Sequence, residues 1–349
     1  PKSTHRLRVE ALQRPRCSLR TPTRTSRLLL PDVMAVVTEL PDTVVAEVVS
    51  QYDIGSLVEY WPADDGVENT NYFLRTSRGV EYVLTVVESI SHHNDLMVRV
   101  LDVAYRNELP VAPVMASKTG AREIYRLDKP MLLAPRLPGR HVDQPNENQC
   151  GAIGKFLAMF HLCTSDLGRE AHEHPRNLSW LNHHAGLSKE VQSKTHQREL
   201  IEALDGVRIG LERPEIEELP RGVVHGDLFR DNALFDDGKL SGVVDFHHTS
   251  QHYWIYDVAV AINDWCTTER HQLDKNRAVA LVAGYQEIRS FEDAEVACYP
   301  TFGLYSAVAF WLSRLAATSV DIESGARLSK DPDEFRQVSA QHMRGFSIF

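Results

Sequence analysis

One short part of the chain concentrates residue types that phosphoryl-transfer chemistry uses. It reads Val223-Val-His225-Gly226-Asp227-Leu-Phe-Arg230-Asp231-Asn232, and Val243-Val-Asp245-Phe246 follows it. An amide oxygen from Asn232 and a carboxylate from Asp245 suit Mg²⁺ that is held mainly by phosphates and water. Asp227, five residues before Asn232, is placed to accept a hydroxyl proton beside such an ion. These residues predict a metal-assisted phosphoryl-transfer site.

A β-hairpin is expected to bring the two segments together. Asp237-Gly238 lies between two apolar runs, which is a strong signal for a two-residue turn. With that turn Asp236 faces Lys239, and counting back places Asn232 opposite Val243. Asp245 then lies two residues further along the same face, about 7 Å away across the strands. The hairpin therefore predicts that Asn232 and Asp245, the two expected metal ligands, point into the same site.

Other motifs argue for little else. The chain has no G-x-G-x-x-G, no Walker loop and no G-x-S-x-G. His247, His248 and His252 have no third ligand at a fixed spacing, so we expect them to line a polar pocket or face solvent rather than bind a metal. His172, His174, His183 and His184 lie in polar, poorly periodic sequence and are expected at the surface.

The His225-Gly226-Asp227…Asn232…Asp245-Phe246 pattern resembles the catalytic core of the aminoglycoside-phosphotransferase and choline-kinase group. Further strings resemble the bacterial homoserine kinase branch of that group, and coverage runs from Met34 to nearly the end. These strings are Glu68-Asn-Thr-Asn71-Tyr-Phe, Tyr82-Val-Leu-Thr85, Ala134-Pro-Arg-Leu-Pro-Gly139, Gly226–Phe235 and Tyr256–Trp265. The resemblance implies an α+β, protein-kinase-like bilobal fold.

The resemblance also implies roles for individual residues. Asp227 would orient and deprotonate the acceptor hydroxyl, while Asn232 and Asp245 would hold Mg²⁺ on the phosphates of ATP. Asp257 would tie down the backbone of the catalytic loop, and Arg230 would neutralise charge on the transferred group.

Two further assignments concern the acceptor. Asp264 lies seven residues after Asp257, on the same face of one helix, and is expected to meet a substrate ammonium. His247, two residues after Asp245, is assigned to the acceptor pocket.

The nucleotide is expected to bind the N-terminal lobe. Gly66, Asn69 and Asn71 belong to the turn over the phosphates, which holds a single glycine. Thr85 occupies the third-strand position where kinases place a phosphate-binding lysine, and the homoserine kinase branch also reads Val-Leu-Thr there. The adenine is expected against 131–135, with Leu133 and Ala134 nearest.

Periodicity in the sequence agrees with two lobes. Residues 34–135 show a short helix at 41–52 and strand patterns at 57–61, 70–76, 80–87, 123–127 and 131–134, which predict a small antiparallel sheet lobe. Residues 136–349 have helical spacing at 150–162, 188–204, 256–265, 277–287 and 305–317, which predicts a larger helical lobe. The catalytic hairpin interrupts the helical part.

Composition restricts the partners. The chain has 349 residues, 43% of them hydrophobic and 25% charged, with a net charge of −10. An acidic balance argues against nucleic acid and anionic membranes, and the apolar stretch at 299–317 is too interrupted for a membrane span. Five cysteines without C-x-x-C favour a reducing compartment, so the cytoplasm is expected.

The first 33 residues differ from the rest. They hold eight Lys or Arg against two acidic residues and are rich in Ser, Thr and Pro. We interpret 1–33 as a disordered basic extension that precedes a natural start at Met34, in preference to a transit-like peptide.

The resemblance to the homoserine kinase branch implies ATP-dependent phosphorylation of L-homoserine, a small-molecule substrate, in threonine biosynthesis. Two alternatives stay open: another hydroxyl kinase of the same fold, acting on an aminoglycoside, choline or a sugar, or a nucleotide-binding regulator without turnover. The sequence leaves the oligomeric state unassigned.

Overall fold

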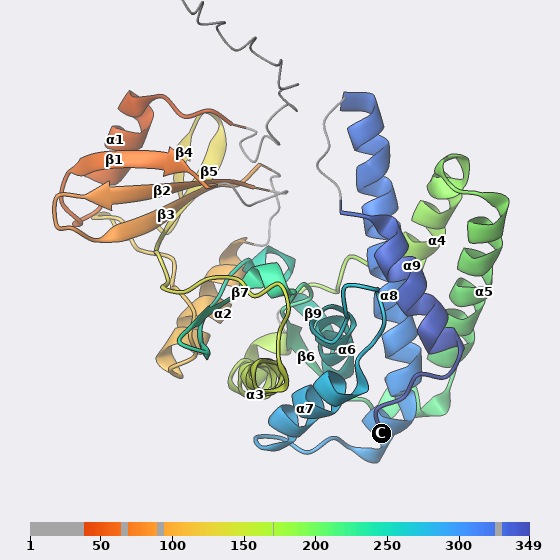
Figure 1. The fold of residues 1–349 in the computed structure, drawn as a ribbon. Coiled ribbons are helices and arrows are strands. Elements are labelled where there is room, and N and C mark those ends of the chain that lie inside the picture. The colour runs from red at the N-terminus through yellow and green to blue at the C-terminus, as the bar shows by residue number, and fades with distance from the viewer. Residues whose placement is uncertain (1–37, 64–68, 89–93, 170, 325–329) are drawn as a thin grey trace, which may run out of the picture. The chain divides into compact units, whose positions relative to one another are not determined.

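The N-terminal part of the chain forms a five-stranded antiparallel sheet with the order β1-β2-β3-β5-β4 (Figure 1). The computed structural model describes residues 38–63, 69–88, 94–169, 171–324 and 330–349, so the predicted basic extension and Gly66 lie outside the described residues. The elements are α1 (Asp42–Ser50), β1 (Leu57–Pro62), β2 (Thr70–Thr76), β3 (Glu81–Val86), β4 (Ile124–Arg126) and β5 (Lys129–Pro135).

Alternation along the strands gives this sheet two different faces. Tyr72, Leu74 and Leu84 point to one face and form a buried core with Val45 and Val48 of α1. Asn71 and Thr85, which are cross-strand partners, belong to the opposite face. That second face therefore carries two of the residues expected near the nucleotide.

Helix α2 (Asn94–Arg106) belongs to a different core. Leu96, Val100 and Leu101 are buried in a large cluster that is otherwise built by the C-terminal helices, and Leu132 of β5 joins it. The small sheet and the helical part therefore share α2 and one strand residue as a packed connection.

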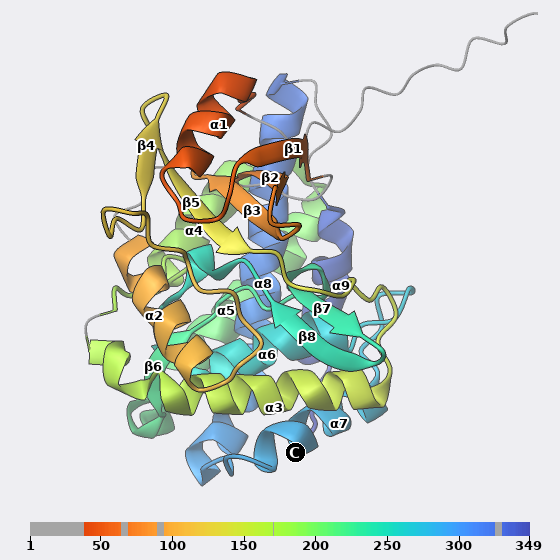
Figure 2. The same ribbon diagram turned by 90° about the vertical axis from the view of Figure 1, so that its left-hand side faces the viewer.

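Helix α6, whose twelve residues are all buried, contacts α3, α7 and α8. Helix α3 packs on α7 so closely that a Cβ at Gly154 would lie 1.9 Å from the Leu281 carbonyl oxygen, and Figure 2 shows the two helices side by side. The helices are α3 (Glu147–Cys163), α4 (Leu178–Leu187), α5 (Lys194–Leu211), α6 (Trp254–Trp265), α7 (Lys275–Gln286), α8 (Asp293–Ser324) and α9 (Pro332–Met343).

Helix α8 is long and apolar enough to cross a membrane by length and composition. It is instead a core helix, since 78% of its apolar window is buried inside the protein. It contacts α4, α5, α6 and α9. The helix predicted at 305–317 lies within α8 and is confirmed.

Two small antiparallel ladders lie within the helical part. Strand β6 (Arg221–Val224) pairs with β9 (Ser250–Tyr253), and β7 (Ala233–Asp236) pairs with β8 (Lys239–Val243). The predicted turn is confirmed, because Asp236 pairs with Lys239 and both Asp237 and Gly238 have positive φ (47° and 76°).

The predicted register beyond the turn is wrong by one residue. Phe235 pairs with Leu240 but Leu234 pairs with Gly242, so Ser241 is an extra residue in β8. The Ser241 hydroxyl donates to the carbonyl oxygens of Pro138 (2.7 Å) and Leu234 (3.1 Å), which holds this bulge. Consequently Ala233, not Asn232, faces Val243.

Candidate active site

The loop that leaves β6 is held by a buried carboxylate. Asp257, in the first turn of α6, is inaccessible to solvent and accepts the backbone N–H groups of His225 (2.8 Å) and Gly226 (2.9 Å). His161 Nε2 lies 3.1 Å from the same carboxylate. Burial alone would raise the pKa of Asp257, but the His161 hydrogen bond and the neighbouring imidazoles hold it below its ordinary value. The loop therefore has a charged anchor.

Gly226 lets the loop turn at this anchor. Its φ is +78°, and a Cβ there would lie 3.0 Å from the His248 carbonyl oxygen and 3.2 Å from His174 Cε1. Only glycine combines that backbone with that close approach. The turn directs the next residue, Asp227, away from the α6 anchor.

Asp227 is mostly enclosed, with 18% of its side chain exposed. Burial raises the pKa of Asp227 to about 7, against the opposing influence of the His248 and Arg176 charges. Arg176 Nη1 lies 3.9 Å from Asp227 Oδ1. A carboxylate with such a pKa is a far better proton acceptor than an ordinary aspartate.

Asn232 fixes the other oxygen of Asp227. Its Nδ2 donates to the Asp227 carbonyl oxygen (2.8 Å) and to Asp227 Oδ2 (3.2 Å). Because a carbonyl only accepts, this contact assigns the amide nitrogen and leaves Asn232 Oδ1 as the atom of this side chain that could bind a metal.

Asp245 follows directly on the paired end of the hairpin. Val244 N–H donates to the Asn232 carbonyl oxygen (3.0 Å), so Asp245 comes one residue after the partner of Asn232. It is exposed, adopts a left-handed backbone (φ 60°, ψ 66°), and its charge contributes to the raised pKa of Asp227. The structure thus brings Asp227, Asn232 and Asp245 together despite the shifted register, and the last two offer the oxygen donors that suit Mg²⁺.

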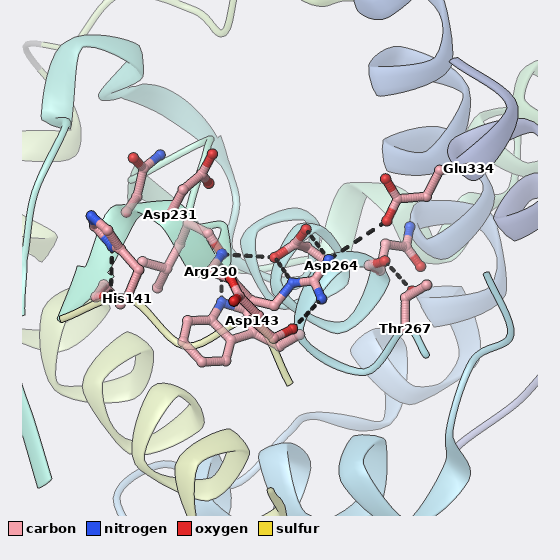
Figure 3. A network of polar contacts seen from close by, with 12 residues as sticks. His141, Asp143, Arg230, Asp231, Asp264, Thr267 and Glu334 are labelled. Atoms are coloured by element: carbon pink, nitrogen blue, oxygen red, sulfur yellow. Dashed lines mark hydrogen bonds and ion pairs between the residues drawn. The ribbon is translucent and has the colours of Figure 1, made fainter. Parts of the chain in front are cut away.

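Two further predicted residues have different partners from those expected. Arg230 donates to Asp264 from its backbone N–H (2.7 Å) and from Nε (3.1 Å), and its Nη1 donates to the Asp143 carbonyl oxygen (2.8 Å). Glu334 of α9 lies 3.6 Å from its Nη2 (Figure 3).

This arrangement gives both residues partners within the protein. The Asp264 carboxylate is 5% exposed and engaged by Arg230. The Arg230 guanidinium is engaged by Asp264, the Asp143 carbonyl and Glu334. Their expected roles toward a substrate ammonium and a phosphoryl group stay predictions. Their pair closes the C-terminal side of the catalytic loop against α6 and α9.

His247 lies in the short turn Phe246–His248 after Asp245 and is partly buried. Its place beside Asp245 is compatible with the acceptor pocket to which the sequence assigned it.

The residues expected at the nucleotide divide into two groups. Thr85 Oγ1 donates to Asn71 Oδ1 (2.7 Å) on the sheet face opposite α1, and Asn69 Oδ1 accepts the Glu88 N–H (3.1 Å) where β3 ends. Leu133 is fully buried in the α1 core and its carbonyl accepts the Met115 N–H (2.7 Å). Of Leu133 and Ala134, only the partly exposed Ala134 therefore offers surface to an adenine.

Sequence reasoning missed Arg176 and misplaced His174. His174, expected at the surface, is 2% exposed and lies against the catalytic loop. Both residues lie in a stretch without helical or strand periodicity, so no pattern in the sequence indicated that they are buried beside Asp227.

Comparison with known proteins identifies the family. A model of the phosphotransferase enzyme family matches residues 59–291, which is more than half of the chain. The chain belongs to the phosphotransferase enzyme family. Among its curated relatives, a homoserine kinase of Pseudomonas aeruginosa (strain LESB58) is 36% identical over 314 residues, covering 88% of this chain and 96% of that protein. A homoserine kinase of Neisseria meningitidis serogroup B is 32% identical over 307 residues, covering 87% and 98%.

Solved structures agree on the fold of this phosphotransferase. Amicoumacin kinase in complex with AMP-PNP, Ca²⁺ and its ligand has a TM-score of 0.65 at 17% identity, with 86% of this chain and 94% of that chain covered. A microcompartment-associated aminopropanol kinase has a TM-score of 0.62 at 17% identity, with 86% and 96% covered. The predicted α+β, kinase-like bilobal fold is confirmed.

Proposed function

We propose that the protein is a homoserine kinase, which transfers the γ-phosphoryl group of ATP to the side-chain hydroxyl of L-homoserine and gives O-phospho-L-homoserine for threonine biosynthesis. The observation that carries the proposal is the cluster of Asp227, Asn232 and Asp245 in a chain whose curated relatives, matched over most of its length, are homoserine kinases.

The catalytic step assigns one task to each member of the cluster. Asp227 accepts the hydroxyl proton as the acceptor oxygen attacks the γ-phosphorus, and the bond from that phosphorus to the bridging oxygen of ADP breaks. Asn232 holds Asp227 through its Nδ2 and, with Asp245, offers oxygen atoms to Mg²⁺. The bound ion would neutralise charge on the phosphates.

The remaining residues hold this geometry. Asp257 anchors the backbone at His225 and Gly226, and the Arg230–Asp264 pair fixes the loop five residues later. Asn71, Thr85 and Ala134 are our candidates for the nucleotide face of the sheet, and Asn69 for its edge. The positioning residues matter because displacing a reacting group by about 1 Å costs roughly 100-fold in rate.

We assign the reaction to the cytoplasm. Cys150, Cys163, Cys266 and Cys298 are free thiols in the described part of the chain, and burial raises the pKa of Cys163 to about 11, so it is a poor nucleophile. Thiols of this kind are compatible with a reducing compartment.

A second acceptor class is favoured by one observation. The structural neighbours include one kinase named for amicoumacin and one named for aminopropanol. Their folds match this fold about equally well, with TM-scores of 0.65 and 0.62. An amino alcohol or an antibiotic hydroxyl is therefore the alternative acceptor.

The test is ADP release with a panel of acceptors at saturating Mg-ATP. We expect the highest kcat/KM with L-homoserine, and lower values with 3-amino-1-propanol, choline and kanamycin. A preference for one of these other acceptors would assign the second class, and ATP binding without acceptor-dependent turnover would assign a regulator.

A further inference from the structure

Three buried polar groups beside the catalytic loop have no hydrogen-bond partner. They are Arg176 Nη1, His174 Nε2 and the Tyr256 hydroxyl, and none of them makes a hydrogen bond to any described residue. Arg176 is 7% exposed, His174 2% and Tyr256 0%. Because a buried donor or acceptor without a partner is costly, three in one place indicate a site that a ligand completes.

All three lie at the loop that carries Asp227. Arg176 Nη1 is 3.9 Å from Asp227 Oδ1, and the His174 ring lies where a side chain on Gly226 would touch it. The Tyr256 ring is centred 5.0 Å from the His174 ring, and the charges of both Arg176 and Asp227 act on its hydroxyl. Arg176 is therefore next to the proton acceptor of the proposed reaction, and His174 and Tyr256 are next to the preceding loop residue.

Arg176 is held in place from two sides. The Tyr305 hydroxyl donates to the Arg176 carbonyl oxygen (2.8 Å), and the guanidinium lies 4.6 Å from the centre of the Phe310 ring. A guanidinium so fixed is organised for an anion before the anion binds, and its planar donors match a carboxylate.

The two carboxylate oxygens of Asp227 face different groups. Asn232 contacts Oδ2, on the side of the hairpin that carries the proposed metal ligands. Arg176 approaches Oδ1. An anion on Arg176 is therefore on the acceptor side of Asp227. Homoserine spans four bonds from its carboxylate carbon to its hydroxyl oxygen, roughly 5 Å when extended, which is a distance that lets one molecule reach both Arg176 and Asp227.

His174 suits the other charged group of an amino acid. Ser250 Oγ donates to the His248 carbonyl oxygen (3.0 Å), so it accepts from His174 Nδ1 (2.9 Å) and leaves a lone pair on Nε2. Burial, with the nearby His252 and Arg176 charges, lowers the pKa of His174 well below its ordinary value, which keeps the ring neutral. A neutral acceptor beside Asp227 suits an ammonium.

We propose that Arg176 binds the α-carboxylate of the acceptor and that His174 Nε2 and the Tyr256 hydroxyl complete an amino-acid pocket beside Asp227. This inference rests on the proposed function, because it names how the same site selects homoserine over alcohols that lack a carboxylate.

The experiment compares L-homoserine with L-homoserine amide, which lacks the negative charge, in the wild type and in Arg176→Gln. Arg221→Gln is the matched control, because Arg221 lies 4.7 Å over the Tyr253 ring but is exposed. We expect Arg176→Gln to raise KM for homoserine by roughly 10- to 100-fold, with KM for ATP and KM for the amide unchanged. The lost charge also acts on Asp227, so any change in kcat should be the same for both acceptors. Arg221→Gln should match the wild type.

Three results would overturn the proposal. One is an equal rise in KM for homoserine and for the amide, which would make Arg176 a residue of phosphoryl transfer or of folding. Another is a wild type that does not distinguish the two acceptors, and this comparison decides the matter even if Arg176→Gln fails to fold. A wild type that uses neither acceptor would reject the homoserine kinase assignment itself, whereas the third result, homoserine turnover with an unchanged KM in a folded Arg176→Gln, would reject only the pocket.

Discussion

Replacing Asp257 by Asn tests how the catalytic loop is held. The carboxylate accepts the Gly226 N–H on Oδ1 and the His225 N–H on Oδ2. An asparagine has the same shape but a single oxygen, so in either orientation its NH₂ group meets one of these two N–H groups. The change also removes a charge that His161 contacts.

The expected magnitude follows from this geometry. One charge-assisted hydrogen bond, about 1.5–3 kcal/mol, is lost, and a buried donor is left facing another donor. We expect Asp257→Asn to lower the free energy of unfolding by about 2–4 kcal/mol and, by displacing the loop, to lower kcat roughly 100-fold.

Urea unfolding and steady-state turnover measure the two effects. Asp205→Asn is the control, because Asp205 is exposed and its ion pair with Arg208, at 3.7 Å, is a weak surface contact. We expect it to change the free energy of unfolding by less than about 0.5 kcal/mol. Wild-type stability together with wild-type turnover in Asp257→Asn would refute this account of the loop.

Two further predictions concern the metal and pH. Asp245→Asn should raise the Mg²⁺ concentration needed for half-maximal turnover, and high Mg²⁺ should restore part of the activity. The control Asp236→Asn, at the exposed hairpin turn, should leave the Mg²⁺ dependence unchanged. An unchanged Mg²⁺ dependence in Asp245→Asn would count against Asp245 as a metal ligand. Burial lowers the pKa of His342 to about 3. Below about pH 6.5 the unfolded chain therefore binds a proton on His342 that the folded chain does not bind. The free energy of unfolding falls as pH drops from about 6.5 to about 3, by up to about 1.4 kcal/mol per pH unit for this group. His342→Gln, which retains a donor for Asn263 Oδ1, should give a shallower decline of unfolding free energy between pH 7 and 5, and an unaltered slope would disagree with this reasoning.

The hairpin shows what local sequence predicts and where it stops. Asp237-Gly238 specified the turn because its two central positions need positive φ, which Asp and Gly can adopt. The bulge at Ser241 shifted the register, and it depends on a hydrogen bond to Pro138, about a hundred residues earlier in the chain. Asn232 and Asp245 still meet, since Val244 bonds to Asn232 beyond the bulge.

Helical spacing gave similarly partial information. It placed Asp257 and Asp264 on one face of a helix, and the structure shows that helix, α6, to be buried along all twelve residues. It did not identify their partners, because the Arg230 contact with Asp264 depends on how the loop folds back onto the helix. Arg176 could not be predicted for the same reason. Its placement depends on contacts with Phe310 and Tyr305, which are distant from it in the sequence.

The helical lobe was predicted best where periodicity is strong. The expected helix at 188–204 is instead a short turn at Ser188–Val191 followed by α5 from Lys194, where the Ser193 side chain caps the helix by accepting the His196 N–H. Helices α4 and α9 were not expected. Their polar faces give only a weak apolar stripe, and packing on α8 stabilises them.

The most direct test of the central claim is the product formed from ATP and L-homoserine by the wild type and by Asp227→Asn, followed by ³¹P NMR, with ATP binding measured in parallel. We predict a phosphate monoester on the homoserine side chain with the wild type, and in Asp227→Asn a kcat lower by about 100- to 10,000-fold with ATP binding retained. Full turnover in Asp227→Asn would contradict Asp227 as the proton acceptor, and with it the account of this site.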